Sequence, residues 1–528
     1  MPFRFHSILF PLALVAAVFA ATATAAQEEG PLLTLKEAIA RGVAENLDLQ
    51  VAALEIPKRR EDVTAERAAF DPAIEAAARA GEARILTGAV LYSNDYQLLK
   101  EISTSAGIRK RFVTGMQGRV SLETYRLENN SRADALDPQY GTVLLLNLTQ
   151  PLLKDFGTEV NTTGIRLSEN AVRQGVFGYL DRAQQLATEI ERAYWSLAQA
   201  HFVLGYRLDS LHLAEELAAG NRERLNQGVI SVTQVDQARA AVADREEAAL
   251  SARQQVETLS NSLKDLLEIR TGDPQADGIL RTTHIPKANP DYPSVDDAVA
   301  SALEQRPDLR QARVALAAQD IRLAYFENQK LPRLDLNGTF GLNGLSGDDR
   351  PVRLFGGENT TGLDGDYLDA WDRMAAADGY QWEVDLRFSV PIGNRAAESR
   401  YARTRIGKQQ LLLGLKRLEG GIETEVKNAR VTVGRSLERV AMADRFERLA
   451  EETLDQEMAR LREGLSDTFR ILDLQDDLVM ARIRKVAAVA DFHRGMADLY
   501  GAMGTNLERF DIAAEVETEA FPALDGVN

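Results

Sequence analysis

The residues that most often carry enzyme or metal chemistry are sparse in this chain. Cysteine is absent from the 528 residues, which excludes disulfides, thiolate nucleophiles and cysteine-based zinc sites. The histidines of the chain body are scattered without metal-ligand spacing, at His201, His212, His284 and His493. Nucleophile-elbow, Walker A and dinucleotide-binding motifs do not occur. We therefore predict no catalysis, no cofactor and no metal site.

Three aspartates in the second half of the chain have a spacing that can bring them close together. Asp476 and Asp477 follow Asp473 by three and four residues, which places all three on one face if the segment is helical. An acidic helical face of this kind can simply be solvated. The net charge of −17 fits the solubility of a large exposed surface. It argues against a nucleic-acid partner, because phosphate binding needs a basic surface.

Residues 1–26 have the pattern of a cleaved export signal. Arg4 and His6 precede an apolar run from Ile8 to Ala21, and Ala23-Thr24-Ala25 offers a cleavage site. No other stretch approaches ~20 apolar residues, so we expect no transmembrane helix in the mature chain. Without cysteine, we also expect no lipid anchor. A β-barrel is then the remaining way to span a membrane.

The chain has the pattern of an internal duplication. Residues 34–72 align without a gap with residues 294–332, so that Ala38 meets Ala298 and Pro72 meets Pro332. The predicted first repeat covers 27–270, with a helix at 32–72, a strand pair within 73–150 and a helix-turn-helix at 151–270. The predicted second repeat covers 294–505, with the same parts at 294–332, 333–392 and 393–505. A linker at 271–293 joins the repeats, and 506–528 form a C-terminal tail.

Strands are predicted where apolar and polar residues alternate with a period of two. Residues 380–390, YQWEVDLRFSV, alternate most clearly, and residues 333–342 follow the same pattern. In the first half, residues 120–123 and 142–148 alternate, whereas residues 73–83 do so only weakly. We predict two strands in each half, four in all. The segments between the strands of each pair, 84–118 and 343–380, are expected to be long external loops.

Long coiled-coil helices are predicted after each strand pair. Apolar residues recur at intervals of seven within 190–225, 235–263, 426–440 and 472–486. Residues 165–226 contain no proline and would form a helix of roughly 90 Å. Gly228 and Gly464 each interrupt the helical pattern and permit a tight reversal. The helices that follow have candidate N-caps in Ser231 or Thr233 and in Asp467 or Thr468.

The segment 380–390 has one apolar face and one face that carries charges. In a membrane barrel the apolar face meets lipid and the charged face lines a wet lumen. Four strands cannot close alone, because the smallest known membrane barrels have eight. We therefore predict that copies of the chain associate. Tyr380 and Trp382 suit an interfacial aromatic belt or are ordinary edge-strand aromatics.

In this order, the elements resemble the TolC-type outer-membrane efflux proteins. The resemblance covers about residues 32–510 and includes the repeat starts TLKEAIARGVAENLDLQ and SVDDAVASALEQRPDLR. It also includes the strand exits LTQPL and FSVPI, the turns GVISVTQVDQAR and GLSDTFRILDLQD, and the closing LYGAMG. It implies an α+β membrane protein that forms a homotrimer. Four strands per chain would build one twelve-stranded β-barrel, and the helices would form a coiled-coil tunnel through the periplasm.

The resemblance further implies a passive channel in the outer membrane, with no catalysis. Substrate would arrive from an inner-membrane pump through a periplasmic adaptor that docks at the helical tips. The tip positions are Gly228, Val229, Gly464 and Leu465. The candidate pore constriction comprises Asp473, Asp476, Asp477, Arg470, Asp236 and Arg239. The lumen-facing strand residues would be Asp335, Asn337, Glu383, Asp385 and Arg387.

Three residues depart from the family pattern at the tips. Arg470 stands where an acid is common, and Leu225 and Leu461 stand where an aromatic is often found. A family network of tyrosine, acid and arginine therefore does not carry over. As a hypothesis, Arg470 pairs with Asp473 or Asp467 in the closed channel.

A periplasmic adaptor or other coiled-coil scaffold is the alternative to a channel. Adaptors also carry an export signal and a helical hairpin, but they usually have one hairpin flanked by small soluble β-domains. Two internal copies and strands suited to lipid favour the channel. Drug, metal and protein export use channels of one shape, so the sequence predicts no particular substrate.

Overall fold

The computed structural model describes residues 32–88, 95–273, 275–354 and 357–513. The predicted export signal and residues 514–528 of the predicted tail lie outside this range. The chain forms two compact units. The helical unit takes its described residues from Met1–Leu54, Phe177–Arg310 and Lys416–Val516, and the sheet unit takes them from Glu55–Val176 and Gln311–Leu415. Each unit therefore draws on both halves of the sequence, so the two predicted repeats are not two spatial domains.

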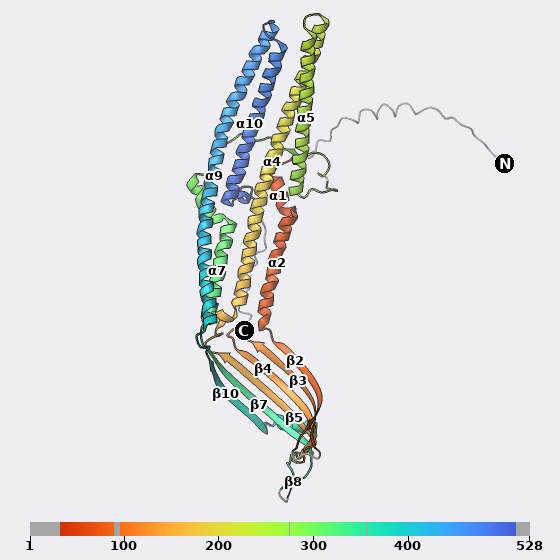
Figure 1. The fold of residues 1–528 in the computed structure, drawn as a ribbon, viewed down its shortest axis with the longest axis vertical. Coiled ribbons are helices and arrows are strands. Elements are labelled where there is room, and N and C mark those ends of the chain that lie inside the picture. The colour runs from red at the N-terminus through yellow and green to blue at the C-terminus, as the bar shows by residue number, and fades with distance from the viewer. Residues whose placement is uncertain (1–31, 89–94, 274, 355–356, 514–528) are drawn as a thin grey trace, which may run out of the picture. The chain divides into compact units, whose positions relative to one another are not determined.

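Helices make up most of the described chain (Figure 1). They are α1 (Leu35–Glu45), α2 (Leu47–Arg67), α3 (Thr158–Asn161), α4 (Thr163–Asn226), α5 (Val232–Leu266), α6 (Val295–Gln305), α7 (Pro307–Asn328), α8 (Tyr367–Ala375), α9 (Arg395–Arg462), α10 (Thr468–Met503) and α11 (Asn506–Arg509), with a 3-10 turn η1 (Ala68–Phe70). The predicted long helices are confirmed, since α4 has 64 residues and α9 has 68. Among the described residues, none of these helices is both long enough and apolar enough to cross a membrane.

Helices α1 and α6, which occupy aligned positions in the predicted repeats, have matching local structure. Each has 11 residues. Thr34 and Ser294 occupy the N-cap positions, and each side chain accepts a hydrogen bond from the backbone N–H three residues on. Ala38 and Ala298, which align in the sequence, are both fully buried. The aligned segments 34–45 and 294–305 therefore form equivalent capped helices.

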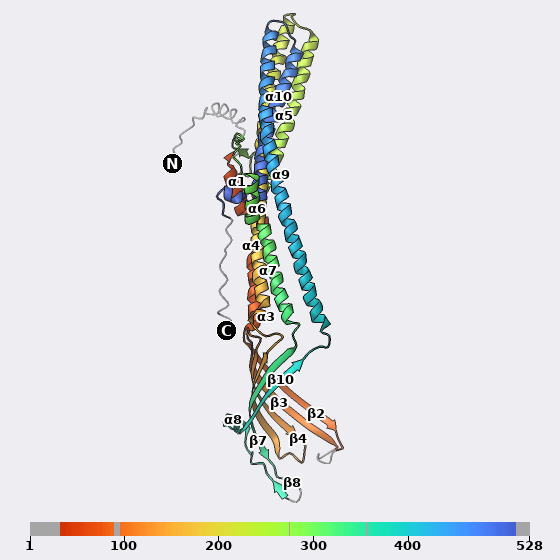
Figure 2. The ribbon, with the colours of Figure 1, turned by 90° about the vertical axis from the view of Figure 1, so that its left-hand side faces the viewer.

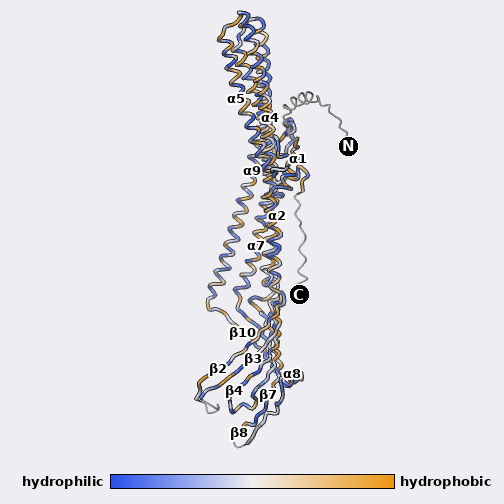
Figure 3. Tube along the Cα trace, turned by 90° about the vertical axis from the view of Figure 1, so that its right-hand side faces the viewer, coloured by the Kyte–Doolittle hydropathy of each residue, from blue (hydrophilic) through white to orange (hydrophobic). Residues whose placement is uncertain are grey.

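Many of the predicted heptad positions are buried in the core of the helical unit, and the others are partly buried. Hydrophobic and hydrophilic positions alternate along α4 and α5 (Figure 3). The heptad residues with at most 1% of their surface exposed are Ile190, Leu197, Val256, Leu263, Val426 and Val433. Full burial of such a side chain contributes about 1.5–3 kcal/mol. Helices α4 with α5 and α9 with α10 form two hairpins that lie side by side (Figures 1 and 2).

The sheet unit contains an antiparallel sheet of six strands in the order β10-β7-β5-β4-β3-β2 (Figure 1). These strands are β2 (Ala73–Leu86), β3 (Tyr96–Arg111), β4 (Gln117–Asn129), β5 (Leu136–Pro151), β7 (Arg333–Asp349) and β10 (Gly379–Ser389). Two smaller sheets pair β1 (Leu32–Leu33) with β6 (Arg281–Thr282), and β8 (Val352–Leu354) with β9 (Gly357–Asn359).

The prediction of four strands is wrong for this sheet, because the first half contributes four strands instead of two. The segment 84–118, expected to be a loop, contains the whole of β3. Its inner stretch alternates Ile102, Thr104, Ala106 and Ile108 with small and polar residues, a contrast too weak to stand out in the sequence. Pairing with a neighbour on each side fixes the strand. The other expected loop, 343–380, holds the end of β7, β8, β9 and α8.

The register of all six strands places their even-numbered residues on one face of the sheet. One cross-strand row contains Ile74, Ile108, Val120, Leu146, Phe340 and Trp382. Side chains alternate between the two faces of a strand, so the odd-numbered residues share the opposite face. We call these the even face and the odd face. The even face carries a band of apolar residues, and the odd face carries most of the charges.

Candidate constriction, docking tips and charged sheet face

The two hairpin turns of the helical unit have the same backbone geometry. Gly228 and Gly464 have φ values of 77° and 75°, in the left-handed region that favours glycine. At each turn, the glycine N–H donates to the carbonyl three residues back and the next N–H donates to the carbonyl five residues back. This is the Schellman arrangement that ends a helix and satisfies its last carbonyls. The predicted tight reversals at both glycines are confirmed.

The caps of the returning helices settle the alternatives that the sequence left open. Ser231 caps α5 in a capping box with Gln234. Asp467 caps α10, where its Oδ1 accepts from the backbone N–H of Arg470 at 2.9 Å. These caps fix where each helix resumes after its turn.

Apolar side chains project from both turns. Val229 is 62% exposed and Leu465 is 69% exposed, each directly after its glycine. Val232 and Phe469, at the starts of α5 and α10, are also more than half exposed. We call these four residues the tip cluster. Val229 and Leu465 are predicted from the sequence. Val232 and Phe469 are not, because their only signal is an apolar residue soon after a turn.

The predicted constriction residues form mostly local, exposed pairs. Arg470 Nη1 lies 3.4 Å from Asp473 Oδ2, and Arg239 Nη1 lies 3.4 Å from Asp236 Oδ1. All four side chains are more than half exposed, and such pairs contribute little to stability. The pairing of Arg470 with Asp473 is therefore present, while its role in closure stays a prediction. Asp477 is exposed.

Asp476 belongs to a different network of hydrogen bonds. Its centre is a buried arginine that is not among the predicted site residues. The side chain of Arg245 on α5 is 3% exposed, and its Nη2 lies 3.2 Å from Asp476 Oδ1 on α10. It also donates to Gln475 Oε1, to the Leu472 carbonyl and to the Ser210 carbonyl of α4. One guanidinium thus joins three helices from both hairpins.

A sequence signal for Arg245 exists in the heptad pattern of α5. Ala238 precedes it by seven residues and Ala252 follows it by seven. An arginine in an otherwise apolar seam position points to a buried polar contact. The spacing does not reveal the partner, because Asp476 lies on a helix from the other half of the chain.

The five predicted lumen residues, Asp335, Asn337, Glu383, Asp385 and Arg387, share the odd face of the sheet. Asn337 Nδ2 donates to Asp385 Oδ2 at 2.7 Å. Asp335, which is 4% exposed, accepts from Arg333 Nε at 2.6 Å and lies opposite Arg387 in the register. Their common face is observed, and their exposure to a lumen stays a prediction.

The even face is apolar and exposed at the edge strand β10. Tyr380, Trp382, Val384, Leu386 and Phe388 are each 60–69% exposed. A soluble sheet would cover such a row with a second layer. This face and the odd face therefore have opposite solvent preferences.

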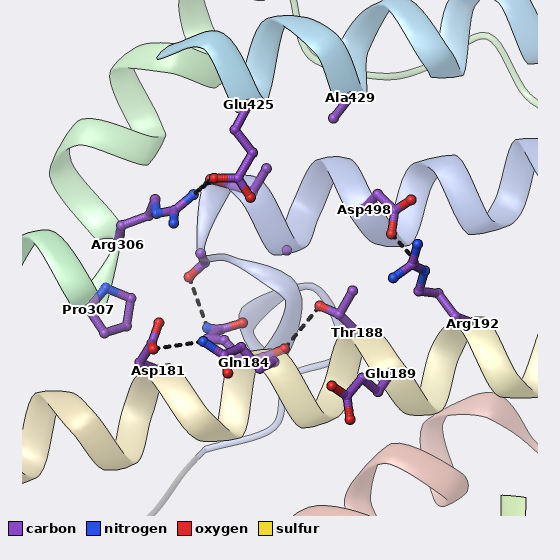
Figure 4. Close-up of a pocket in the computed structure, with 14 residues that line it drawn as sticks. Asp181, Gln184, Thr188, Glu189, Arg192, Arg306, Pro307, Glu425, Ala429 and Asp498 are labelled. Atoms are coloured by element: carbon purple, nitrogen blue, oxygen red, sulfur yellow. Dashed lines mark hydrogen bonds and ion pairs between the residues drawn. The ribbon is translucent and has the colours of Figure 1, made fainter. Parts of the chain in front are cut away.

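A polar cavity of about 390 Å³ lies in the helical unit (Figure 4). Arg306 Nη1 contacts Glu425 at 2.7 Å, and Arg192 Nε contacts Asp498 at 3.0 Å. Burial raises the pKa of Asp498. Burial, followed by the charge of Asp308, raises the pKa of Asp181 in the same wall. None of the predicted site residues lines this cavity.

No cluster suited to a metal ion occurs in the described part of the chain. Two of the histidines instead contribute to packing. His201 Nε2 lies 2.9 Å from the Leu280 carbonyl, and His493 Nε2 lies 2.9 Å from the Pro286 carbonyl. Both contacts tie the segment predicted as a linker to the long helices.

The helical unit thus has paired coiled-coil hairpins, and the sheet unit has one apolar and one charged face. Residues 298–505 match the model of the family described as outer membrane efflux protein. This match confirms the resemblance to TolC-type outer-membrane efflux proteins over these residues. The family is one of channels and not of enzymes, and the adaptor alternative gains no support.

Solved outer-membrane channels share the fold. OprN matches with a TM-score of 0.60 and 18% identity, over 89% of each chain. CusC matches with a TM-score of 0.62 and 16% identity, over 89% of this chain and 91% of that chain. CmeC of Campylobacter jejuni matches with a TM-score of 0.62 and 15% identity, over 89% and 86%. No curated protein matches the sequence.

Proposed function

We propose that this chain is the outer-membrane channel of a tripartite efflux or type I secretion system. A periplasmic adaptor docks at its helical tips, and an inner-membrane pump supplies the energy and the substrate. The chain reaches the membrane after loss of the export signal predicted in residues 1–26 and carries no lipid anchor. The observation that carries this proposal is the exposed apolar even face opposite a charged odd face.

The sheet edges support assembly of copies into one barrel. In the six-strand order, β2 and β10 are the two ends of the sheet. Unpaired strand edges invite pairing with another chain. A sheet of six strands is also too small to close as a membrane barrel. In a homotrimer, six strands from each of three copies make eighteen strands, instead of the twelve that four strands per copy would give.

An eighteen-stranded barrel would hold an aqueous channel, because barrels of 16–18 strands leave an open interior. The even face would meet the lipid of the outer membrane and the odd face would meet water. Bands of lipid-facing residues in such barrels are about 25 Å tall. The run from Tyr380 to Phe388 spans a comparable height. Strand tilt shortens this height, and the flanking residues extend it.

The constriction of this channel involves the helices near the tips. The link from Arg245 to Asp476 holds the two hairpins of one chain together. Asp473, Asp477, Arg470, Asp236 and Arg239 are exposed charges on the same two helices, α5 and α10. Rings of carboxylates contributed by several copies favour cations and repel one another.

Reconstitution tests the channel directly. Outer membranes that contain the chain are extracted with carbonate, and the retained protein is sized and then inserted into planar bilayers. We expect an integral trimer that conducts ions. Release by carbonate, or a monomer without conductance, would contradict the proposal.

Docking of the adaptor at the tips has its own test with a matched control. Val229 in the tip cluster is 62% exposed, and Val431 on α9 is 60% exposed. We expect Val229→Ser together with Leu465→Ser to weaken binding of the cognate adaptor and to reduce export. Val431→Ser changes an equally exposed valine in the same unit and should leave both unchanged. Equal effects of the two changes would refute docking at the tips.

A further inference from the structure

Helix α8 lies on the even face of the sheet, beside β7 (Figure 2). Gly344 is an even-numbered residue of β7, and a Cβ there would lie 1.9 Å from the carbonyl oxygen of Ala370. Thr124 Oγ1 of β4 donates to Tyr367 Oη at 2.7 Å. The absence of a side chain at Gly344 thus allows the helix to rest directly on the sheet backbone.

The helix covers a hydroxyl-bearing row next to the apolar band. Thr124 and Thr142 are 9% and 0% exposed, and their hydroxyl oxygens lie 3.3 Å apart. Tyr140 packs edge-on against Tyr367 at a centroid distance of 6.1 Å. Leaving these hydroxyls in hydrocarbon without partners would cost free energy. Helix α8 removes that cost at the place where the apolar band gives way to polar residues.

The position of α8 is fixed by hydrogen bonds at both ends. Asp366 caps the first turn through the N–H groups of Leu368 and Asp369, and its own carbonyl accepts a hydrogen bond from Ser346 Oγ of β7 at 2.6 Å. Arg373 Nη1 in the last turn donates to the Leu345 carbonyl at 2.7 Å. The helix is therefore held to the sheet and is not a free segment of the loop.

The outer side of α8 still presents apolar and aromatic surface. Ala370 is fully buried and Met374 is 8% exposed, so both face the sheet. Leu368 is 67% exposed, Tyr367 is 39% exposed, and Trp371 is half-buried. Tryptophan, tyrosine and leucine on a short amphipathic helix are typical of the boundary between lipid headgroups and acyl chains.

We propose that α8 is an interfacial helix, which inserts Leu368 and Trp371 at the headgroup boundary of the lipid around the even face. This inference rests on the proposed function, since it requires the even face to meet lipid. The occupant is lipid because α8 continues the apolar band of that face. A second copy is excluded from this place by the sheet order, because β5 and β7 beneath the helix are interior strands and copies would pair at β2 and β10.

The three tryptophans of the chain, Trp195, Trp371 and Trp382, allow a sharp test. Trp195 is 4% exposed in the helical unit, and Trp382 lies on the even face of β10. The variant Trp195→Phe/Trp382→Phe retains Trp371 alone, and Trp195→Phe/Trp371→Phe retains Trp382 alone. Each trimer is reconstituted into phosphatidylcholine vesicles that carry a quencher at a shallow or a deep acyl position.

We expect lipid quenchers to reduce the emission of both tryptophans, with Trp371 quenched more strongly by the shallow probe. Quenching of Trp382 without quenching of Trp371 would place α8 in water and overturn this inference, while the channel proposal would stand. If neither tryptophan were quenched, the even face would not meet lipid. The proposed function would then fail together with the inference.

A second readout uses the absence of cysteine. Leu368→Cys and Leu465→Cys replace leucines of nearly equal exposure, 67% and 69%, in the sheet unit and at a helical tip. A polarity-sensitive dye is attached to each cysteine. In vesicles, its emission maximum should move to shorter wavelength only at position 368. Equal emission at the two positions would overturn the inference.

Discussion

The Nη2 of Arg245 lies 3.2 Å from the Oδ1 of Asp476 and joins helices α5 and α10. The arginine side chain is 3% exposed, whereas the aspartate side chain is 53% exposed. The arginine end of the contact is thus buried, and the aspartate end is exposed to solvent. Replacing the arginine leaves buried acceptors without its hydrogen bonds. Replacing the aspartate leaves Arg245 with three further acceptors. The two residues contribute unequally to one link.

We predict that Arg245→Met destabilises the helical unit and increases channel opening. Methionine fills similar volume but leaves the buried Gln475 Oε1 without this donor. A buried acceptor that loses its partner costs about 1–3 kcal/mol. Thermal unfolding of the detergent-solubilised trimer should show a lower midpoint, and planar bilayers should show higher open probability.

Arg239→Met is the matched control for this prediction. Arg239 lies on the same helix, but its side chain is 55% exposed and its contact with Asp236 is local. Exposed pairs of this kind contribute about 0–1 kcal/mol. Stability should stay close to wild type, and a loss of stability as large as that of Arg245→Met would show that the buried link has no special role.

Most elements of the helical unit could be predicted from the sequence, because the patterns that indicate them are local. Heptad spacing, tip glycines and caps each act within a few residues, and each appears where predicted. Arg245 could be suspected from its seam position, but its partner could not. The contact joins residues 231 positions apart in the sequence. The heptad spacing within one helix does not show which distant helix packs against it.

The glycine at each tip leads to a second prediction. Gly464 has a φ of 75°, and a residue with a Cβ is strained in this region by about 1–2 kcal/mol. We expect Gly464→Ala to lower the free energy of unfolding by that amount and to weaken adaptor binding. Denaturant titration and adaptor pull-down measure the two effects.

Gly420→Ala is the control for the tip glycine. Gly420 lies within α9, and a Cβ there would meet open space. Alanine in a helix interior is favoured over glycine by roughly 0.5–1 kcal/mol. The same substitution should therefore have opposite signs at the two positions. Stabilisation at Gly464 would contradict the role of its left-handed backbone.

The sheet was harder to predict than the helices. Strand β10 alternates bulky apolar with charged residues, so its faces were clear. Strand β3 alternates isoleucine, threonine and alanine with serine and glycine, and its pairing depends on neighbours on both sides. Helix α8 was hidden because a helix of 9 residues has a short periodic signal and begins within a segment rich in glycine and aspartate.

Charges on the odd face lead to a third prediction, on ion selectivity. Glu383 and Arg387 lie on the same face of β10, four residues apart. If this face lines the pore, Glu383→Gln should shift the reversal potential in a salt gradient toward anion permeation, and Arg387→Gln should shift it toward cation permeation. Fixed charges in a pore raise the local concentration of the opposite ion. Shifts of the same sign, or none, would show that the odd face does not line the pore.

His493 leads to a fourth prediction, on the pH dependence of stability. It stacks on Trp195 at a centroid distance of 4.7 Å. Burial lowers its pKa below the ordinary value of 6.5, and the charge of Arg509 acts in the same direction. The hydrogen bond with the Pro286 carbonyl opposes them. The folded chain therefore keeps His493 neutral at pH values where the unfolded chain already protonates it.

The sign follows from this difference in bound protons. Below about pH 6.5 the unfolded state binds more protons at this residue, so the free energy of unfolding falls as the pH falls toward the lowered pKa. Above pH 6.5 this residue's contribution is fully present. His493→Gln keeps an amide donor for the Pro286 carbonyl but removes the titration. Urea midpoints between pH 8 and about pH 5 should therefore fall less steeply for the variant than for wild type. Parallel curves would mean that another group carries the acid sensitivity of the helical unit.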